Sequence, residues 1–419
     1  MVEKFLNNRL LTLFMIPIFF GSLTVFSFEP FNLTIINFII FPSCFYLLLY
    51  INKKSRSVYR KKPYKKNLFI FGLSFGFGFY LSGISWITNS LTFDENFKIL
   101  IPFALILIPL FLSLFLGLTT LIIGPYLKLD FSSVIIFSAG IAFSDYLRAH
   151  VFTGFPWNLW AYSTTTYNEI LQIVNLIGLY TYNLIVITLF TLPIIFLFKI
   201  SKVKKLIIVL IKLLFILSLY IYGNYEINKN KKILKSVKEK IYVKIISPNF
   251  DLQYGLSSKE IEDRFNKLVR YSDPDKNRKT IFIWPEGVFS GYSFDELKSL
   301  RKIISNNFKN DQLILFGVNR FNVQKNGYYN SLVIINNKME ILQEYKKQKL
   351  VPFGEFLPFQ KILNKFGFKK ITEGHGSFLR GKNQSNLIYD NLNILPLICY
   401  EIIFTKFTQE SDLNTNLIV

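Results

Sequence analysis

Seven long apolar runs are the feature that most constrains the fold of this chain. They cover residues 10–27, 34–51, 68–88, 99–124, 132–147, 170–198 and 206–223. Most approach or exceed the roughly 20 residues that an α-helix needs to cross a bilayer. The hydrophobic content of 51%, the 45 phenylalanines and the mean hydropathy of +0.33 also exceed those of an ordinary soluble domain. The sequence therefore predicts a multi-pass α-helical membrane bundle of about seven helices over residues 1–224.

The distribution of positive charge predicts how these helices are oriented. Fifteen Lys and Arg residues lie at the N-terminus and in the loops near 52–66, 126–130 and 199–205, whereas the alternate loops hold two, Lys98 and Arg148. Because cytoplasmic loops carry the excess of positive charge, we expect a cytoplasmic N-terminus. Seven crossings then place everything after about residue 224 in the periplasm of a bacterial inner membrane. This topology accounts for much of the net charge of +22 without nucleic acid binding.

The basic stretch 228–240 opposes that orientation, but long translocated domains do not follow the loop rule. Within the apolar runs, Gly72 and Gly76 have the Gly-x-x-x-Gly spacing that lets helices approach closely, and we expect them to serve packing. Asp145 and Arg148 are one helical turn apart and can pair with each other. A structural ion pair and a substrate contact are equally good interpretations of Arg148.

The outer segment "TGFPWNLWAYS", residues 153–163, is rich in aromatic side chains. Pro156, Trp157 and Trp160 suit a rigid turn at the level of the lipid headgroups. An aromatic belt is one interpretation of this segment, and contact with a lipid substrate is the other.

The sequence changes character from residue 241 onwards. Short apolar segments with strand composition alternate with amphipathic ones, and a serine cap opens the first expected helix, 257–272. The remaining expected elements are strands at 241–247, 280–284, 313–318, 331–336, 339–346 and 393–398, and a helix at 294–306. We therefore expect a linker at 225–240 and a layered α/β domain at 241–419.

Three polar residues lie where expected strands end. Glu286 follows one buried strand, Lys347 follows another, and Cys399 follows the strand before the turn "CYE". Such positions often carry chemistry, because strands aim side chains into a common crevice. A glutamate can accept a thiol proton, and a lysine can stabilise an oxyanion, so these three residues can perform acyl transfer without histidine. A small buried hydrophobe is the alternative interpretation of Cys399.

The two cysteines, Cys44 and Cys399, lie too far apart in the sequence to indicate a disulfide framework or a metal cluster. The chain also has only two histidines, so we expect no metal and no cofactor.

Three motifs carry a family resemblance: "WPEG" at 284–287, "KKQKLVPFGEFLPF" at 346–359 and "ICYEIIF" at 398–404. Together they resemble the carbon-nitrogen hydrolase (nitrilase) superfamily with its Glu-Lys-Cys triad. With the seven preceding apolar runs and "TGFPW", the whole chain resembles the bacterial apolipoprotein N-acyltransferases. The resemblance implies an α-β-β-α sandwich for the α/β domain.

The resemblance also implies roles for individual residues. Glu286 corresponds to the general base, Lys347 to the oxyanion-stabilising lysine and Cys399 to the acylated nucleophile. Lys346 and Lys349 are local rivals of Lys347, and the choice rests on counting back from "LVPFGE".

Three further positions match the active-site pattern of the family: Glu355, Tyr400 and Glu401. Their alternative interpretations are a loop carboxylate, core packing and a solvated turn, respectively. Two positions depart from the family pattern, because Leu256 stands where a substrate-contacting tryptophan is usual and Ser247 where a glutamine is common. The departures bear on substrate positioning rather than on the triad.

The chain ends at "NLIV", residues 416–419, inside an expected strand. Relatives continue into a further active-site segment and a final span, so we expect a truncated version. The resemblance implies transfer of an acyl chain from a membrane phospholipid, through a thioester, to the N-terminal amine of a diacylglyceryl-modified apolipoprotein, by a monomer. The alternatives are a membrane-tethered amidase or nitrilase, a non-catalytic fragment, and a transporter or receptor. The last is disfavoured, because the apolar runs contain almost no charged residues.

Overall fold

The computed structural model describes residues 6–58, 63–92, 95–236, 241–251, 253, 255–275, 277–358, 377–382, 386–409, 412 and 414–419. The chain divides into two compact units, Met1–Ser236 and Val237–Val419. The first is helical, and the second combines helices with two β-sheets.

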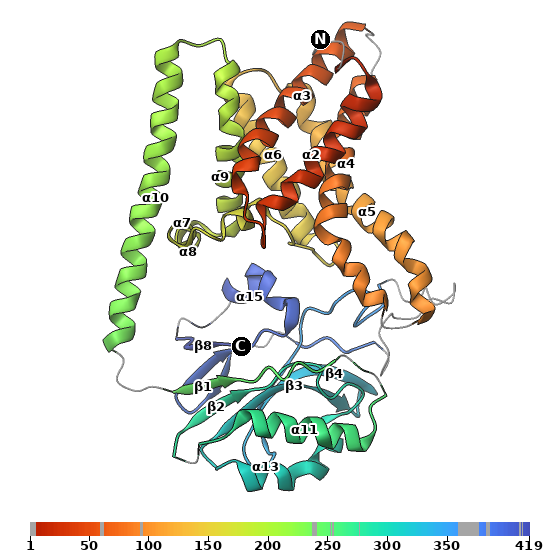
Figure 1. Cartoon of the computed structure of the whole chain (residues 1–419), viewed down its shortest axis with the longest axis vertical. Helices are drawn as coiled ribbons and strands as arrows, with labels where there is room; N and C mark the ends of the chain where they lie inside the picture. Colours follow the sequence, from red (N-terminus) through yellow and green to blue (C-terminus); the bar gives the residue numbers. More distant parts are fainter. Residues whose placement is uncertain are drawn as a thin grey trace. The chain divides into compact units, whose positions relative to one another are not determined.

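The helical unit consists of long apolar helices joined by short helical turns (Figure 1). Its α-helices are α2 (Ile16–Thr24), α3 (Asn37–Val58), α4 (Pro63–Ile84), α5 (Ile101–Ile123), α6 (Phe131–His150), α7 (Asn168–Leu171), α8 (Val174–Ile177), α9 (Leu179–Thr191) and α10 (Lys202–Ser236). Within the described residues, five helical segments are long and apolar enough to cross a bilayer: Thr34–Lys53, Lys65–Thr92, Phe97–Tyr126, Leu179–Leu197 and Lys202–Ser236. The run at 10–27 forms the shorter apolar segment Leu11–Ser27, and the run at 132–147 lies within α6.

The glycine pair in α4 has the packing role that its spacing predicts. A methyl group at Gly72 would come within 2.1 Å of the Thr120 hydroxyl oxygen, and one at Gly76 within 2.8 Å of the Ser113 Cβ. Both partners belong to α5, so the two glycines let α4 and α5 approach closely.

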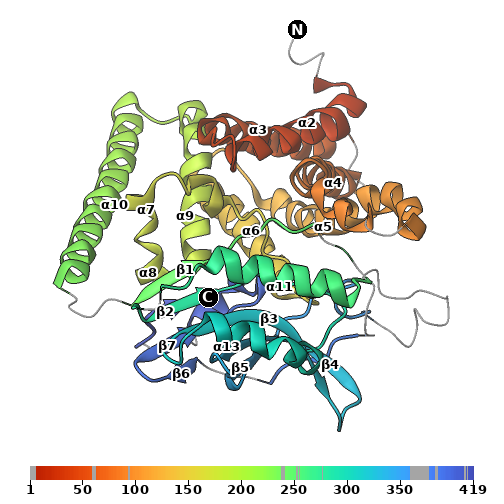
Figure 2. The same cartoon turned by 60° about the horizontal axis from the view of Figure 1, so that its bottom comes forward.

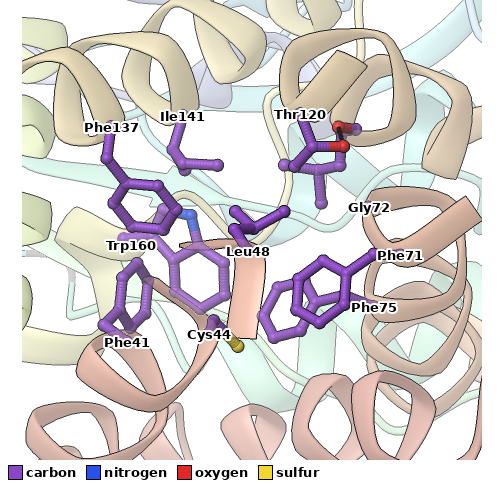
Figure 3. A pocket seen from close by; sticks show the side chains of 11 residues that line it. Phe41, Cys44, Leu48, Phe71, Gly72, Phe75, Thr120, Phe137, Ile141 and Trp160 are labelled. Carbon is purple, nitrogen blue, oxygen red and sulfur yellow. Dashed lines mark hydrogen bonds between the residues drawn. The ribbon is translucent and has the colours of Figure 1, made fainter. Parts of the chain in front are cut away.

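A small apolar cavity lies beside this contact, inside the helical unit (Figure 3). Its lining includes Gly72 and Thr120 on one side and Phe41 and Trp160 on the other, with Cys44 between them in this view. Cys44 is 5% exposed. This cysteine is therefore a small buried hydrophobe, the ordinary environment of a free cysteine.

The α/β unit has eight strands among the described residues, in two sheets. The strands are β1 (Tyr242–Ile245), β2 (Thr280–Ile283), β3 (Leu313–Asn322), β4 (Gly327–Ile335), β5 (Ile341–Lys346), β6 (Leu387–Tyr389), β7 (Leu392–Leu395) and β8 (Leu417–Ile418). The first five form a mixed sheet in the order β1-β2-β3-β4-β5, and the last three form a second sheet in the order β6-β7-β8. The helices are α11 (Ser258–Ser272), α12 (Phe294–Leu297), α13 (Arg301–Asn307) and α15 (Thr405–Gln409).

Alternating side chains of the five-stranded sheet bury its two faces against different layers. Phe282, Ile314 and Val333 pack with α11 and α13, whereas their neighbours Ile281 and Leu313 pack with the second sheet. This period of two is what a strand covered on both faces requires. Figure 2 shows α11 and α13 on the same side of the larger sheet. The predicted fold class, a helical bundle followed by a nitrilase-like α/β domain, is confirmed.

The local signals of the α/β unit were largely correct. Ser257 caps α11 through a complete capping box with Glu260, as its position before the helix predicts. The helix expected at 294–306 divides into α12, a short turn and α13. Strand β8 lies within the strand expected at 416–419, whereas β6 was not predicted. Strand β6 spans three residues, which is too short for a periodic pattern to reveal.

Candidate active site

Cys399 lies at a sharp turn just after the second sheet. Strand β7 ends at Leu395, the next three residues are buried, and Cys399 opens a short helical turn that runs to Ile403. Its φ of +56° is in the left-handed region, which non-glycine residues rarely adopt. Such strain concentrates at functional sites. The turn leaves Cys399 exposed, in contrast to buried Cys44.

Lys347 follows β5 and is almost completely buried, with 1% of its side chain exposed. Its Nζ lies 2.9 Å from Oε1 of Glu355 and 3.9 Å from Oε1 of Glu286. The rival lysines lie elsewhere, because Lys346 stacks on the Tyr329 ring and Lys349 on the Phe404 ring. The described geometry therefore brings Lys347 together with both carboxylates.

Glu286 follows β2 and is partly exposed. Its backbone packs against Gly317 of β3, where an added methyl group would come within 3.0 Å of the Glu286 Cα. A side chain at that position would displace the glutamate. The absence of a Cβ at Gly317 therefore helps to position Glu286 beside Lys347.

Asn330 is the one residue of this cluster that sequence reasoning missed. It lies on β4, is 8% exposed, and its Nδ2 donates to Oε1 of Glu286 at 2.7 Å and to Oε1 of Glu355 at 2.9 Å. One amide thus bridges the two carboxylates that Lys347 also contacts. The available signal was a carboxamide, followed by Ser331, inside the largely apolar and aromatic strand "YYNSLVII".

Glu355 also organises the loop that carries it. Its Oε2 accepts a hydrogen bond from the Val351 backbone at 2.8 Å, and its Oε1 is the oxygen that Lys347 and Asn330 share. The carboxylate is therefore a bonded part of the cluster rather than a solvated loop carboxylate.

Glu401 joins the lysine loop to the cysteine turn. It is fully buried, and Oε1 accepts from the backbone N–H groups of Gln348 and Lys349 at 2.7 and 2.8 Å. Oε2 accepts from the backbone of Ile398 at 2.9 Å and from the Tyr345 hydroxyl at 3.1 Å. These bonds reach the residues adjacent to Lys347 and Cys399. The solvated-turn interpretation of Glu401 is therefore wrong.

Tyr400 connects the same two segments. Its hydroxyl donates to the Leu350 carbonyl at 2.9 Å, and the Lys347 Nζ lies 5.8 Å from the centre of its ring. Burial, followed by the negative charges of Glu355 and Glu401, raises the pKa of the Tyr400 hydroxyl, which keeps it a donor. The ring forms one wall beside the lysine.

The electrostatics of the cluster favour a resting thiol and a charged lysine. Burial raises the pKa of the Cys399 thiol, Glu286 adds to that effect, and Lys347 opposes it. Burial alone would lower the pKa of Lys347, but Glu286 and Glu355 raise it above its ordinary value. A base must therefore remove the thiol proton as the sulfur attacks.

The four candidates in the helical unit have different environments. Arg148 is 2% exposed, pairs with Asp145 at 3.0 Å and donates to the backbone carbonyls of Phe155 and Trp157. Trp160 is 1% exposed and stacks on Phe79. Arg148 and Trp160 are therefore packed inside the unit.

Pro156 is also buried, whereas Trp157 is half-buried against Trp86, with ring centres 5.2 Å apart. Trp157 is thus the one of the four with substantial accessible surface. Within the described residues, no three His, Cys, Asp or Glu side chains gather as a metal site.

Comparison with known proteins matches both units. The family model for the apolipoprotein N-acyltransferase N-terminal domain matches residues 20–192, and that for carbon-nitrogen hydrolase matches residues 253–410. The apolipoprotein N-acyltransferase of Rhodopseudomonas palustris is 28% identical over 400 residues, which is 92% of this chain and 73% of the relative. That of Brucella melitensis is 27% identical over 399 residues, with the same coverage of both chains.

Other relatives match over a smaller part of their length. The apolipoprotein N-acyltransferase of Allorhizobium ampelinum is 28% identical over 81% of this chain and 65% of its own. Among solved structures, the NitN amidase from Neterenkonia sp. AN1 covers 43% of this chain and 65% of its own, with a TM-score of 0.27 and 14% identity. That structural similarity is too low to support an argument.

Proposed function

The chain belongs to the apolipoprotein N-acyltransferase family, and from this premise we propose that it moves an acyl chain from a membrane phospholipid to the N-terminal amine of a diacylglyceryl-modified apolipoprotein. The observation that carries the proposal is the buried Lys347, shared by Glu286 and Glu355, together with the exposed Cys399 at its strained turn. These groups are the parts of an acyl-transfer site without histidine. All of them come from one chain, so the proposed chemistry needs no second subunit, and we propose a monomer.

The first half-reaction acylates the enzyme. The Cys399 sulfur attacks the ester carbonyl carbon, Glu286 accepts the thiol proton, and the Lys347 ammonium stabilises the oxyanion. The ester C–O bond then breaks, and the leaving alkoxide takes the proton from Glu286. The products are a Cys399 thioester and a lysophospholipid.

The second half-reaction uses the same groups, with the thiolate now as the leaving group. The neutral α-amine of the acceptor attacks the thioester carbonyl, and Glu286 accepts its proton. The C–S bond breaks, and the Cys399 thiolate leaves beside Lys347 before Glu286 returns the proton. Nitrogen replaces sulfur on the acyl carbon, so an amide forms and the thiol is regenerated.

Glu355, Asn330 and Glu401 have positioning roles in this scheme. Asn330 fixes the carboxylate oxygen of Glu286 that faces the lysine, and Glu355 holds both Asn330 and Lys347. Glu401 fixes the backbone on both sides of the reaction centre. Holding reacting groups in a productive geometry supplies much of an enzyme's rate enhancement. We therefore expect loss of any of the three to lower the rate of acylation more than substrate binding.

Exposed apolar side chains beside the site favour a lipid substrate. Phe353, on the loop between Lys347 and Glu355, is 46% exposed, and Ile402, three residues after Cys399, is 60% exposed. Phe353 has a φ of +64°, so the loop holds a bulky aromatic residue in a strained conformation. An acyl chain is the kind of ligand that would cover such side chains. In the helical unit, we propose that the half-buried Trp157 contacts lipid.

The charge pattern of the apolar half supports the accompanying location. We propose an inner-membrane protein with a cytoplasmic N-terminus and a periplasmic α/β unit, where both lipid substrates are found. The main alternative is a membrane-tethered hydrolase that gives the same thioester to water. Acceptor choice, rather than the triad, distinguishes the two.

Intact-mass measurement tests the proposal. The protein and its Cys399→Ala variant are incubated in detergent with mixed phospholipids, and we expect an added acyl mass that hydroxylamine removes and that the variant lacks. A diacylated lipopeptide should then discharge the adduct and gain the acyl chain. If the acyl group is released only as free fatty acid, the protein is a hydrolase. If neither sample gains an acyl adduct, the thioester mechanism is refuted.

A further inference from the structure

Helix α10 is much longer than a membrane crossing requires. Its 35 residues, Lys202–Ser236, are continuous. At about 1.5 Å per residue the helix measures about 52 Å, whereas the hydrocarbon core of a bilayer is about 30 Å thick. Most of α10 is exposed in the helical unit, and it stands apart from α2–α5 in both views (Figures 1 and 2). A segment of this helix must therefore extend beyond the hydrocarbon core.

Two features locate the point where α10 leaves the apolar layer. Gly223 contacts the short helix α7 so closely that a methyl group would come within 1.7 Å of the Glu169 carbonyl oxygen. Helix α7 begins with two polar residues, Asn168 and Glu169, and Asn168 is exposed. Exposed Tyr220 and Tyr225 flank the contact, and tyrosine is enriched at the headgroup level. Residue 223 therefore marks the interface, and the segment Glu226–Ser236 lies beyond it.

That segment, which we name the α10 extension, is strongly basic. It carries Lys229, Lys231, Lys232 and Lys235, all exposed, against the single acidic residue Glu226. Glu226 lies 3.5 Å from Lys229, and among the described residues the other three lysines form no ion pair. Helical geometry places those three within an arc of about 100° on one face.

Topology does not explain this charge. The positive-inside rule accounts for the basic loops on the cytoplasmic side of the spans. The α10 extension lies on the other, periplasmic side. Four lysines on the non-cytoplasmic side oppose the rule. A binding role is the physical reason for keeping them there, and this argument rests on the orientation proposed above.

We propose that the α10 extension is a docking surface for the headgroups of anionic phospholipids. Its lysines lie about 9–18 Å along the helix axis from Gly223, which is at or just outside the headgroup layer. A charged membrane surface attracts cations within a Debye length of about 8–10 Å. Charge complementarity therefore favours anionic lipids over zwitterionic ones around this end of the helix.

Lipid composition around the intact protein tests the proposal. The full chain carrying Cys399→Ala, so that no turnover changes the lipids, is incorporated into bilayers of equal phosphatidylglycerol and phosphatidylcholine. Polymer-bounded particles are excised, and their lipids are compared with the bulk mixture. We expect phosphatidylglycerol enrichment to fall roughly twofold or more when Lys229, Lys231, Lys232 and Lys235 are all changed to Gln. The corresponding change of all four to Arg should retain it.

A matched control removes the same charge elsewhere. Lys298, Lys302, Lys309 and Lys325 of the α/β unit are changed together to Gln, and enrichment should stay at the starting level. Unchanged enrichment in the extension variant would overturn the proposal, as would an equal loss in the control. Binding of the same variants to heparin, a soluble polyanion, is measured in parallel. If the extension variant loses heparin binding but keeps its lipid enrichment, the proposal is overturned in favour of a polyanion partner. The bilayers have the same lipids in both leaflets, so the result does not depend on how the protein inserts. The Cys399→Ala chain transfers no acyl group, so a negative result here would leave the proposed function untouched.

Discussion

The two cysteines show how backbone position decides what one side chain does. Cys44 is enclosed by apolar groups on α3, where a thiol serves only to fill space. Cys399 has a left-handed backbone at the end of a buried strand, and it lies exposed next to Lys347 and Glu286. The left-handed turn follows the buried residues 396–398 and leaves Cys399 exposed. A buried thiol gains nothing from such a turn, so this contrast supports a chemical role.

The resting state of Cys399 gives the first prediction. Since burial and then Glu286 raise the pKa of its thiol, Glu286→Gln should lower that pKa by removing a negative charge. Iodoacetamide alkylation at pH 8 should then be roughly three to ten times faster, even though acyl transfer is lost. Mass spectrometry of the Cys399 peptide over pH 7–10, in a Cys44→Ser background, measures the rate. Slower alkylation in the variant would mean that Glu286 already activates the resting thiol.

Asn330 gives the second prediction. Its amide donates to one oxygen of Glu286 and one of Glu355, so Asn330→Ala leaves both carboxylates without that donor. We expect the rate of Cys399 acylation to fall by roughly 10- to 100-fold, because small misplacements of reacting groups have effects of that size. Rapid-quench intact-mass measurement gives the rate and the half-saturating phospholipid concentration, which should change little.

Two comparison variants separate positioning from general damage. Asn330→Asp keeps the shape of the side chain but adds a third carboxylate beside Lys347, and it should be at least as slow as the alanine variant. Asn336 follows the same strand, but its carboxamide donates to Glu340 and not to the cluster. The Asn336→Ala variant should therefore be acylated at the normal rate. A normal rate in Asn330→Ala would remove this residue from the site.

At the scale of elements, a buried ion pair fastens a loop to a helix in the helical unit. Arg148, near the end of α6, binds the carbonyls of Phe155 and Trp157, while Asp145 binds both Arg148 and the Asn183 amide at 2.9 Å. The Arg148 guanidinium also lies 5.3 Å from the centre of the Tyr80 ring. The cluster therefore connects α4, α6 and α9 to the segment that carries Trp157.

Removing the cation from this cluster gives the third prediction. Arg148→Met leaves Asp145 buried without its partner, which costs about 3–5 kcal/mol of stability. The thermal midpoint in detergent should fall, and protease cleavage should increase within residues 152–158. The paired change Asp145→Asn with Arg148→Met should recover part of the loss, since no unpaired charge remains. Lys128→Gln, which removes an exposed cation, is the control and should change neither measurement.

The same scale shows what the sequence could and could not predict. Strands β2, β3 and β4 were predictable, because both of their faces are buried and each therefore appears in the sequence as a short apolar run. The ends of β2 and β5 then located Glu286 and Lys347. Asn330 was not predictable, because a carboxamide in a strand looks the same whether it meets solvent or two carboxylates 25 and 44 residues away.

Arg148 was only half predictable for a similar reason. Its spacing from Asp145 indicates a pair along one helix face, and the pair is present at 3.0 Å. Its bonds to the carbonyls of Phe155 and Trp157 depend on how the chain turns after α6, and backbone carbonyls carry no sequence signature. The interpretation of Arg148 as a structural residue therefore needed the fold.

At the scale of the whole molecule, the proposed chemistry requires that the α/β unit and the N-terminus lie on opposite sides of the membrane. Fifteen basic residues on one set of loops against two on the other support that orientation, whereas the α10 extension opposes it. The extension precedes a long domain, and long translocated domains do not follow the loop rule, so its lysines do not overturn that orientation. The orientation can therefore be tested by labelling Cys399 and a cysteine introduced on the other side of the expected membrane.

Labelling of intact spheroplasts gives the fourth prediction. A membrane-impermeant maleimide should label Cys399 before permeabilisation, because this cysteine is exposed, while Cys44 is buried and should remain unlabelled. In a Cys399→Ala background, Ser201→Cys places a thiol at an exposed position before α10, and it should react only after the membrane is permeabilised. The reverse pattern would place the α/β unit in the cytoplasm, where a periplasmic acceptor is out of reach, and would exclude the proposed reaction while leaving the site geometry unchanged.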